Sequence, residues 1–220
     1  MTLTQKIQLV VSFLFLFLAG TIHQEYKKPF HKVTKQQLAV NLKDSFLLTV
    51  NLGMKRLISS VLWIKTLIDS DEEHYTKNDL NDWMYLRFTT MIKLDPKFKE
   101  VYSMGGQYLS IIKDDDAGAK DIFDKGLSIY PKDYFINYNA LYHYYFELKD
   151  REYALQIFKN IDHDPRVPFY VRSMMSKAAI EGDDPELALR LLEQAKTLTT
   201  NEIILQKLEE RIQKIKKGEP

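Results

Sequence analysis

Residues 119–127 read AKDIFDKGL, and this short stretch holds the pattern that decides the fold. Its alanine, its bulky aromatic residue and its small residue return further along the chain at steps of 35 and then 34 residues. The matching sets are Ala119, Ala154 and Ala188; Phe123, Phe158 and Leu192; Gly126, Ile161 and Ala195; and Pro96, Pro131 and Pro165. Sets of positions that share one period predict an array of repeated structural units.

The apolar residues inside each unit have helical spacing. They occupy positions 119, 122, 123, 126 and 127 in one unit and positions 154, 157, 158 and 161 in the next. Asp184, followed by Pro185 and Glu186, is typical of a capped helix start, and we expect Asp116 and Asp150 to cap the corresponding helices. One helix pair cannot bury its apolar face alone, so we expect antiparallel pairs to stack into an α-solenoid.

The composition excludes several classes of protein. The 220 residues carry a net charge of +1, so no charge excess exists for neutralising nucleic-acid phosphates. Cysteine is absent, which excludes disulfides, thiolate metal sites and a cysteine nucleophile. The 8 glycines and 7 prolines are few, and this favours long helices over a turn-rich β fold. No phosphate-loop, nucleophile-elbow or metalloprotease motif occurs, so we expect neither an enzyme nor a cofactor.

The N-terminus predicts attachment to a membrane. Residues 7–22 read IQLVVSFLFLFLAGTI, which as a helix spans about 24 Å against a hydrocarbon core of about 30 Å. Residues 1–22 are therefore a signal anchor or, if cleavage follows the small residues 19–21, a signal peptide. The lysines that follow favour a cytoplasmic body by the positive-inside rule, whereas the short lead favours export. We expect a periplasmic or otherwise extracytoplasmic body, with the cytoplasmic side as the alternative.

The rest of the chain divides into a polar connector, a repeat region and a terminal segment. The predicted boundaries are 23–43 for the connector, 44–200 for the repeats and 201–220 for the capping helix and tail. We expect helix pairs at 44–68 with 78–93, and then within 97–130, 133–164 and 167–199. The helix over 202–216 has an apolar stripe (Ile203, Ile204, Leu208, Ile212 and Ile215) and a charged face that includes Arg211. This is typical of a capping helix; a coiled coil is the alternative, but the stripe lasts barely two heptads.

The repeat region resembles the tetratricopeptide repeat. The series is Tyr102, Gly105, Gly106, Ala119, Phe123, Gly126 and Pro131, and the next two units follow it more loosely. Two departures are about one extra residue between the helices of each unit, and Asn137 at a usually bulky position. The resemblance covers residues 44–200 and implies a right-handed α-solenoid of stacked antiparallel helix pairs. Segments 51–67 and 94–110 also look like a group of bacterial membrane-anchored repeat proteins.

The resemblance also implies a candidate binding groove. In tetratricopeptide arrays the first helix of each pair lines the concave surface. The positions that match are Gln107, Phe135, Tyr138, Tyr142, Tyr145, Phe169 and Arg172. Tyrosine combines a rigid apolar ring with a polar tip, which suits the capture of a peptide segment. The alternative is that these tyrosines pack between the helices.

Three functions remain open at this point. The first is a membrane-tethered adaptor of the bacterial cell envelope that holds a segment of another protein in this groove. The second is a permanent structural subunit of an envelope, secretion or motility complex, packed through surfaces that include Met174 and Met175. The third is a metal-binding accessory protein or enzyme that uses the acidic run from Asp69 to His74. Because acidic runs commonly cap helices, we expect no metal site, and we expect no small-molecule substrate.

Overall fold

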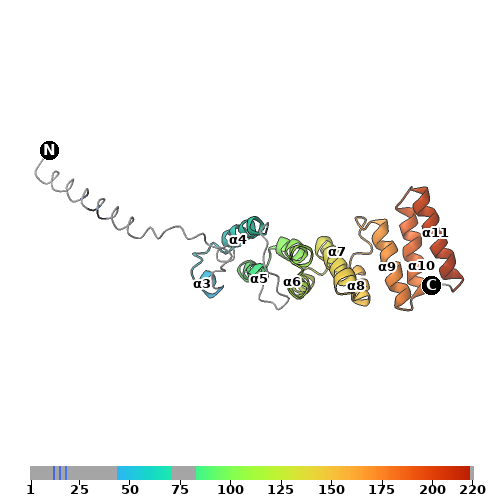
Figure 1. The fold of residues 1–220 in the computed structure, drawn as a ribbon, viewed down its shortest axis with the longest axis horizontal. Coiled ribbons are helices and arrows are strands. Elements are labelled where there is room, and N and C mark those ends of the chain that lie inside the picture. The colour runs from blue at the N-terminus through green and yellow to red at the C-terminus, as the bar shows by residue number, and fades with distance from the viewer. Residues whose placement is uncertain (1–11, 13–14, 16–17, 19–43, 71–82, 219–220) are drawn as a thin grey trace, which may run out of the picture. The chain divides into compact units, whose positions relative to one another are not determined.

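The computed structural model describes residues 44–70 and 83–218, together with Ser12, Phe15 and Leu18. The chain divides into two compact units, Met1–Val40 and Asn41–Pro220. In the first unit the three described residues are helical and exposed. In the second unit every regular element of the described residues is a helix, so the all-α prediction is confirmed (Figure 1).

Several predicted features lie outside the described residues. These are most of the candidate membrane segment 7–22, the connector 23–43, the start of the helix predicted from residue 78, and His74 with its acidic neighbours. Among the helices that are described, none has the length and apolarity needed to cross a bilayer.

The second unit consists of short helices joined by tight turns. In chain order they are α3 (Asp44–Thr49), α4 (Lys55–Asp69), α5 (Trp83–Leu94), the π-helical segments η1 (Val101–Gly105) and η2 (Tyr108–Ile112), α6 (Asp116–Ile129), α7 (Tyr134–Tyr142), the π-helical η3 (His143–Glu147), α8 (Arg151–Phe158), α9 (Phe169–Glu181), α10 (Pro185–Thr197) and α11 (Glu202–Lys216).

Helices adjacent in sequence pack against one another. We call residues 101–129, 134–158 and 169–197 the first, second and third pairs; each joins an A helix to a B helix. The B helices are α6, α8 and α10, and α10 lies between α9 and α11 (Figure 1). Neighbouring pairs touch as well, because α7 contacts both η1 and α6, and α8 contacts α9. One apolar core runs from Met84 to Leu191, and a smaller cluster joins Leu192 and Ala195 to Leu208 and Ile212.

The sequence predicts an extra residue in each unit, and in two of the three pairs a π turn, which inserts one residue into a helix, accounts for it. The A helices of the first and second pairs end in η2 and η3, whereas that of the third pair, α9, is α-helical throughout. The hydrogen bonds that close the three turns are Asp115 N–H to Leu109 C=O, Asp150 N–H to Tyr144 C=O and Asp184 N–H to Ala179 C=O. The first two bonds span six residues and the third spans five. The extra residue is therefore present in two pairs and absent from the third.

Aspartates begin the B helices, with one difference from the sequence prediction. Asp150 and Asp184 accept hydrogen bonds from the N–H groups of Tyr153 and Leu187, which confirms them as N-caps. In the first pair the cap is Asp115, which accepts from Gly118 N–H, so the assignment of Asp116 is wrong. The reason is the turn before it: Asp114 has a φ of 53°, which ends the A helix and leaves Asp115 at the cap.

The single helix predicted over residues 44–68 is broken. Leu52 and Gly53 have φ values of 50° and 78°, outside the helical range. Asn51 stabilises the break because its side-chain oxygen accepts from Gly53 N–H at 3.1 Å and its amide donates to Leu48 C=O at 2.5 Å. Asparagine favours such local bonds over helix continuation. The segment is therefore split into α3 and α4.

The terminal helix α11 has the predicted boundaries, 202–216. Leu208 and Ile212 of its stripe are buried, but Ile203 is 67% exposed, so the stripe is shorter than predicted. Arg211, expected on the solvated face, instead donates to the carbonyl oxygen and the hydroxyl of Ser173 and to Ser176 Oγ. It therefore joins α11 to α9.

The close approach of the helices at Gly126 yields a stability prediction. A Cβ atom at this position would lie 2.7 Å from Tyr102 Cβ and 3.1 Å from Ile136 Cγ2, both in the core. Gly126→Ala should therefore lower the free energy of unfolding by about 1–3 kcal/mol, measured by urea denaturation. Gly182→Ala is the control, because there a Cβ meets nothing closer than 3.4 Å and stability should be unchanged. Equal stability of the two variants would contradict the packing at residue 126.

Candidate functional site

Four aromatic side chains form a ladder along α7 and η3. Tyr134, Tyr138, Tyr142 and Phe146 are spaced four residues apart, so they lie on one side of the helix. Their successive ring centroids are separated by 5.4, 5.0 and 5.7 Å. Tyr138 also forms a hydroxyl–hydroxyl hydrogen bond of 2.9 Å with Tyr170. Burial raises the pKa of Tyr138 to about 12, so the phenol keeps its proton at neutral pH.

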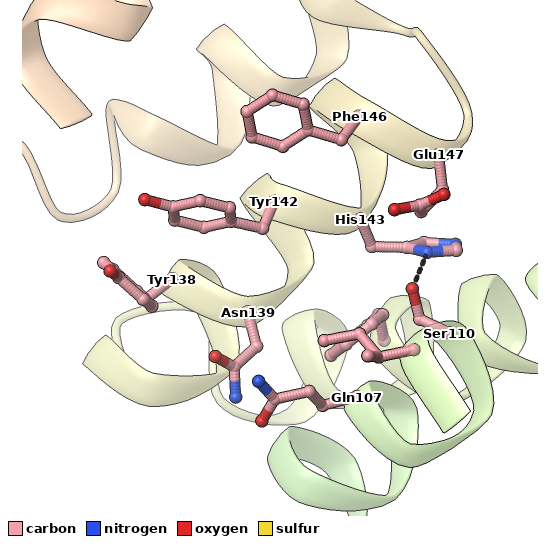
Figure 2. Close-up of a pocket in the computed structure, with 10 residues that line it drawn as sticks. Gln107, Ser110, Tyr138, Asn139, Tyr142, His143, Phe146 and Glu147 are labelled. Atoms are coloured by element: carbon pink, nitrogen blue, oxygen red, sulfur yellow. Dashed lines mark hydrogen bonds between the residues drawn. The ribbon is translucent and has the colours of Figure 1, made fainter. Parts of the chain in front are cut away.

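The aromatic ladder borders two cavities that share three lining residues, Gln107, Tyr138 and Asn139. The smaller cavity, about 340 Å³, also contacts Ile111, Tyr142, Phe146 and Glu147 (Figure 2). The larger one, about 720 Å³, extends along Lys99, Glu100, Met104 and Phe135. Because the cavities share one wall, we treat them as one depression between the A helices of the first and second pairs. We call it the aromatic groove.

Two amide side chains line the aromatic groove together with the rings. Gln107 from the first A helix and Asn139 from α7 lie near each other (Figure 2). Asn139 donates to Ser103 C=O at 3.2 Å, and its side-chain oxygen accepts no hydrogen bond from the described residues. Gln107 is exposed and forms no side-chain hydrogen bond with them. An amide offers both donors and an acceptor, so this pair can bind the backbone of a peptide.

The groove carries a net negative charge. Lys99 and Asp133 form an ion pair of 2.6 Å, and their charges cancel. This pair raises the pKa of Lys99 and lowers that of Asp133, so both stay charged at neutral pH. Glu100 and Glu147 also line the groove, and neither has an ion-pair partner among the described residues. The two glutamates are therefore an uncompensated acidic contribution at this surface.

A buried hydrogen bond connects the two π turns beneath the groove. Ser110 Oγ in η2 lies 2.9 Å from His143 Nδ1 at the start of η3 (Figure 2). His143 is 2% exposed, and its ring lies 5.5 Å from that of Phe123. Burial lowers the pKa of His143, so the imidazole is neutral at pH 7. A serine–histidine contact can activate a hydroxyl for nucleophilic attack. Here both groups are buried within the packed helices, and the contact fixes one A helix against the next.

Four of the residues predicted for the groove line it, namely Gln107, Phe135, Tyr138 and Tyr142. Phe169 is half-buried and packs on the cluster around Leu192. Tyr145 and Arg172 are 7% and 6% exposed and border neither cavity.

Arg172 has an internal partner in the third pair. Its guanidinium donates to Gln194 Oε1 at 3.0 Å and lies 6.0 Å from the ring of Phe158. Met175, expected on a packing surface, is fully buried in the core.

Sequence reasoning missed Phe146, Asn139 and Glu147. The predicted set followed Tyr142 with Tyr145, three residues on, although a regular α-helix places the residues three and four positions on at the same side. The π turn of η3 has more residues per turn, so the next side chain on the groove face is Phe146. The four-residue spacing of aromatic residues from Tyr134 onward was the signal that could have identified it.

The acidic run from Asp69 to His74, considered as a metal site, lies mostly outside the described residues. No group of three His, Asp or Glu side chains within the described part of the chain could hold a metal ion. The sequence also contains the run Asp162-His163-Asp164, which forms a turn in the structure, where Asp164 forms an ion pair with Arg166 at 2.7 Å. Compared with known protein families and with curated proteins, the chain matches none of them.

The buried histidine predicts how stability depends on pH. The folded state lowers the pKa of His143 below its ordinary value of 6.5, so below that pH the unfolded chain binds a proton that the folded chain resists. Above about pH 6.5 this histidine is neutral in both states and costs the fold nothing. As the pH falls below that value, protonation of the unfolded chain lowers the free energy of unfolding. The melting temperature should therefore drop less between pH 7.5 and pH 5 in His143→Gln than in the unchanged chain. His163→Gln, at an exposed histidine, is the control; an equal drop in all three proteins would contradict the assignment.

Proposed function

We propose that the aromatic groove binds a short segment of another protein, and that the chain acts as a binding scaffold and not as an enzyme. The observation that carries this proposal is the conjunction of the aromatic ladder with Gln107 and Asn139 in one groove. Rigid rings bind apolar side chains at low entropic cost, while amides satisfy the polar backbone of the bound segment. Phe135 and Phe146, 58% and 50% exposed, have apolar surface that such a segment would cover.

The charge of the groove indicates which segments it prefers. Glu100 and Glu147 attract lysine or arginine, and the faces of Tyr138 and Tyr142 stabilise a nearby cation. We therefore propose that the segment carries at least one basic residue beside an apolar or aromatic one. Arg172, buried in the third pair, is no part of this site.

The setting is proposed from the sequence. The repeated helix pairs support a right-handed solenoid like that of tetratricopeptide proteins, whose A helices line a concave surface. Residues 7–22 support a membrane tether, with the body in the periplasm and the cytoplasmic side as the alternative. A tether raises the local concentration of the partner, so that a groove of modest affinity suffices. In this setting the chain is an adaptor of the bacterial cell envelope.

The second candidate is a permanent structural subunit of an envelope, secretion or motility complex. It would bury a broad surface and not one groove, so single substitutions would have small effects. Loss of the partner would then destabilise the whole chain. The experiments below separate the two, because an adaptor folds and persists without its partner.

Photo-crosslinking tests the groove directly. A benzoyl-phenylalanine at position 146 places the reactive group on an exposed ring of the ladder, and one at Ile129, 45% exposed on α6, serves as the control position. We expect a discrete adduct from position 146 in cells and none of the same mass from position 129. Mass spectrometry of the adduct then identifies the segment. Adducts of equal mass and yield from both positions would contradict a specific groove.

Truncating the central ring should remove most of the binding. Tyr142→Ala deletes a ring that contacts both Tyr138 and Phe146, so the adduct from position 146 should fall about tenfold or more. Tyr153→Ala is the matched control, because Tyr153 packs on Tyr144 at 4.5 Å outside the groove. Melting curves show whether both variants remain folded. If the two variants lose the adduct equally while folded, the ladder is not the binding surface.

Reversing one charge tests the preference for basic segments. Glu147→Lys should weaken binding of the crosslinked segment, synthesised as a peptide, about tenfold at low salt and less at high salt. Glu210→Lys, at a site on α11 far from the groove in sequence, should leave it unchanged. Fluorescence anisotropy of the labelled peptide measures both. Unchanged affinity in Glu147→Lys would reject the charge preference but not the groove.

A further inference from the structure

The aromatic groove runs lengthwise between the A helices of the first and second pairs. Its larger cavity lies mainly against their N-terminal halves and contacts Glu100 and Phe135. Its smaller cavity lies mainly against their C-terminal halves and contacts Ile111, Phe146 and Glu147. A segment bound in both cavities would therefore lie along these helices.

Two contacts set the level of one A helix against the other. Lys99 Nζ lies 2.6 Å from Asp133 Oδ2, and these residues are 34 positions apart in the sequence. Asn139 donates to Ser103 C=O, and these residues are 36 positions apart. Residues about 35 positions apart are therefore level with one another on the two helices, as expected for neighbouring units of a repeat.

Glu100 and Glu147 consequently lie at opposite ends of the groove. Glu100 is level with Phe135, and Glu147 is 12 residues beyond Phe135, which is about 18 Å along the helix. The two glutamates come from opposite walls, and the axes of packed helices are about 9 Å apart. The diagonal between the two positions is therefore about 20 Å.

The polar groups in the middle of the groove indicate an extended segment. Gln107 and Asn139 border both cavities and lie beside Tyr138 (Figure 2). A helix bonds its own backbone N–H and C=O groups, whereas an extended chain has backbone groups that the two amides can bind. The amides therefore suit an extended chain better than a helical one.

We propose that the preferred segment is an extended stretch of seven residues with a basic residue at each end, an inference that rests on the binding function proposed for the groove. An extended chain advances about 3.3 Å per residue, so the diagonal takes about six steps. Side chains alternate between two faces, so the first, third, fifth and seventh residues all face the groove. The basic ends then reach Glu100 and Glu147. Apolar residues at the third and fifth positions contact the rings and cover Met104 and Ile111, which are 46% and 65% exposed on the opposite wall.

Two peptides of equal composition test the spacing. Both have blocked ends and a fluorescent label; the spaced peptide is Lys-Ser-Leu-Ser-Leu-Ser-Lys, and the rearranged peptide, Lys-Lys-Leu-Ser-Leu-Ser-Ser, brings the lysines together. Fluorescence anisotropy measures the binding of each to the full-length chain at low salt. We expect the spaced peptide to bind about fivefold tighter, because only its lysines can reach both glutamates at once.

Two substitutions at exposed residues assign the contacts. Glu100→Gln should weaken binding of the spaced peptide about fivefold and leave the rearranged peptide unchanged, since its adjacent lysines still have Glu147. Gln107→Met should weaken binding of both peptides about threefold or more, because the peptide backbone loses a partner. Glu210→Gln on α11 and Gln156→Met on α8 are the matched controls, since neither residue borders the groove.

Equal affinity of the two peptides, or failure of both to bind, would overturn the proposed segment. Unchanged affinity in Glu100→Gln would reject the second basic end, and unchanged affinity in Gln107→Met would indicate a segment whose backbone is already bonded, as in a helix. The adduct from position 146 is measured independently of these results. If that adduct forms while the peptides fail, the groove binds a segment of different chemistry; if the adduct is absent as well, the proposed function fails too.

Discussion

The π turn at His143–Glu147 is the constraint on which the groove depends. It adds one residue to the A helix of the second pair, and the N-cap of α8 still closes on Tyr144 through a six-residue hydrogen bond. The added residue changes the phase of the helix, so Phe146 continues the ladder of Tyr138 and Tyr142 while Tyr145 turns into the core. The equivalent turn in η2 places Ser110 where it meets His143. The π turns in η2 and η3 interrupt the regular repeat. They position the rings on one wall of the groove and connect that wall to the other through the contact between Ser110 and His143.

Sequence reasoning succeeded where a side chain's role depends on its own helix. The repeated alanines and bulky residues, the caps at Asp150 and Asp184 and the bounds of α11 all follow from local spacing. Sequence reasoning failed where a local change in the backbone determines where a helix ends, which residue caps it or which side chain faces the groove. The break at Asn51, the shift of the cap to Asp115 and the exchange of Tyr145 for Phe146 each arise from a turn whose residue count the period alone does not reveal. Four groove residues, Gln107, Phe135, Tyr138 and Tyr142, were therefore predictable from register, whereas the place of Phe146 required the π turn of η3.

Tyr102, Asn137 and Arg172 are spaced 35 residues apart, and each of these buried side chains forms its own internal hydrogen bond. Tyr102 and Asn137 each donate to the carbonyl oxygen of the proline six residues earlier, Pro96 and Pro131. Asn137, the polar departure from the repeat pattern, also donates to Asp133 C=O and accepts from Asn160, so its burial leaves it fully bonded. Arg172 occupies the third position and bonds Gln194, and burial lowers its pKa. The 34-residue step read from the sequence aligned Arg172 with Tyr138, but α7 and α9 begin 35 residues apart, so the structure aligns Arg172 with the buried Asn137.

The proposed groove is small, and the modest affinity expected of it has a consequence for function. A groove with two unpaired glutamates and a few rings binds a basic segment with modest affinity, since surface charge attraction is screened by salt. In the proposed membrane-tethered setting, confinement raises the effective concentration of the partner, so modest affinity is enough for the groove to be occupied. A weak contact of this kind is released readily, which suits a reversible adaptor better than a permanent subunit.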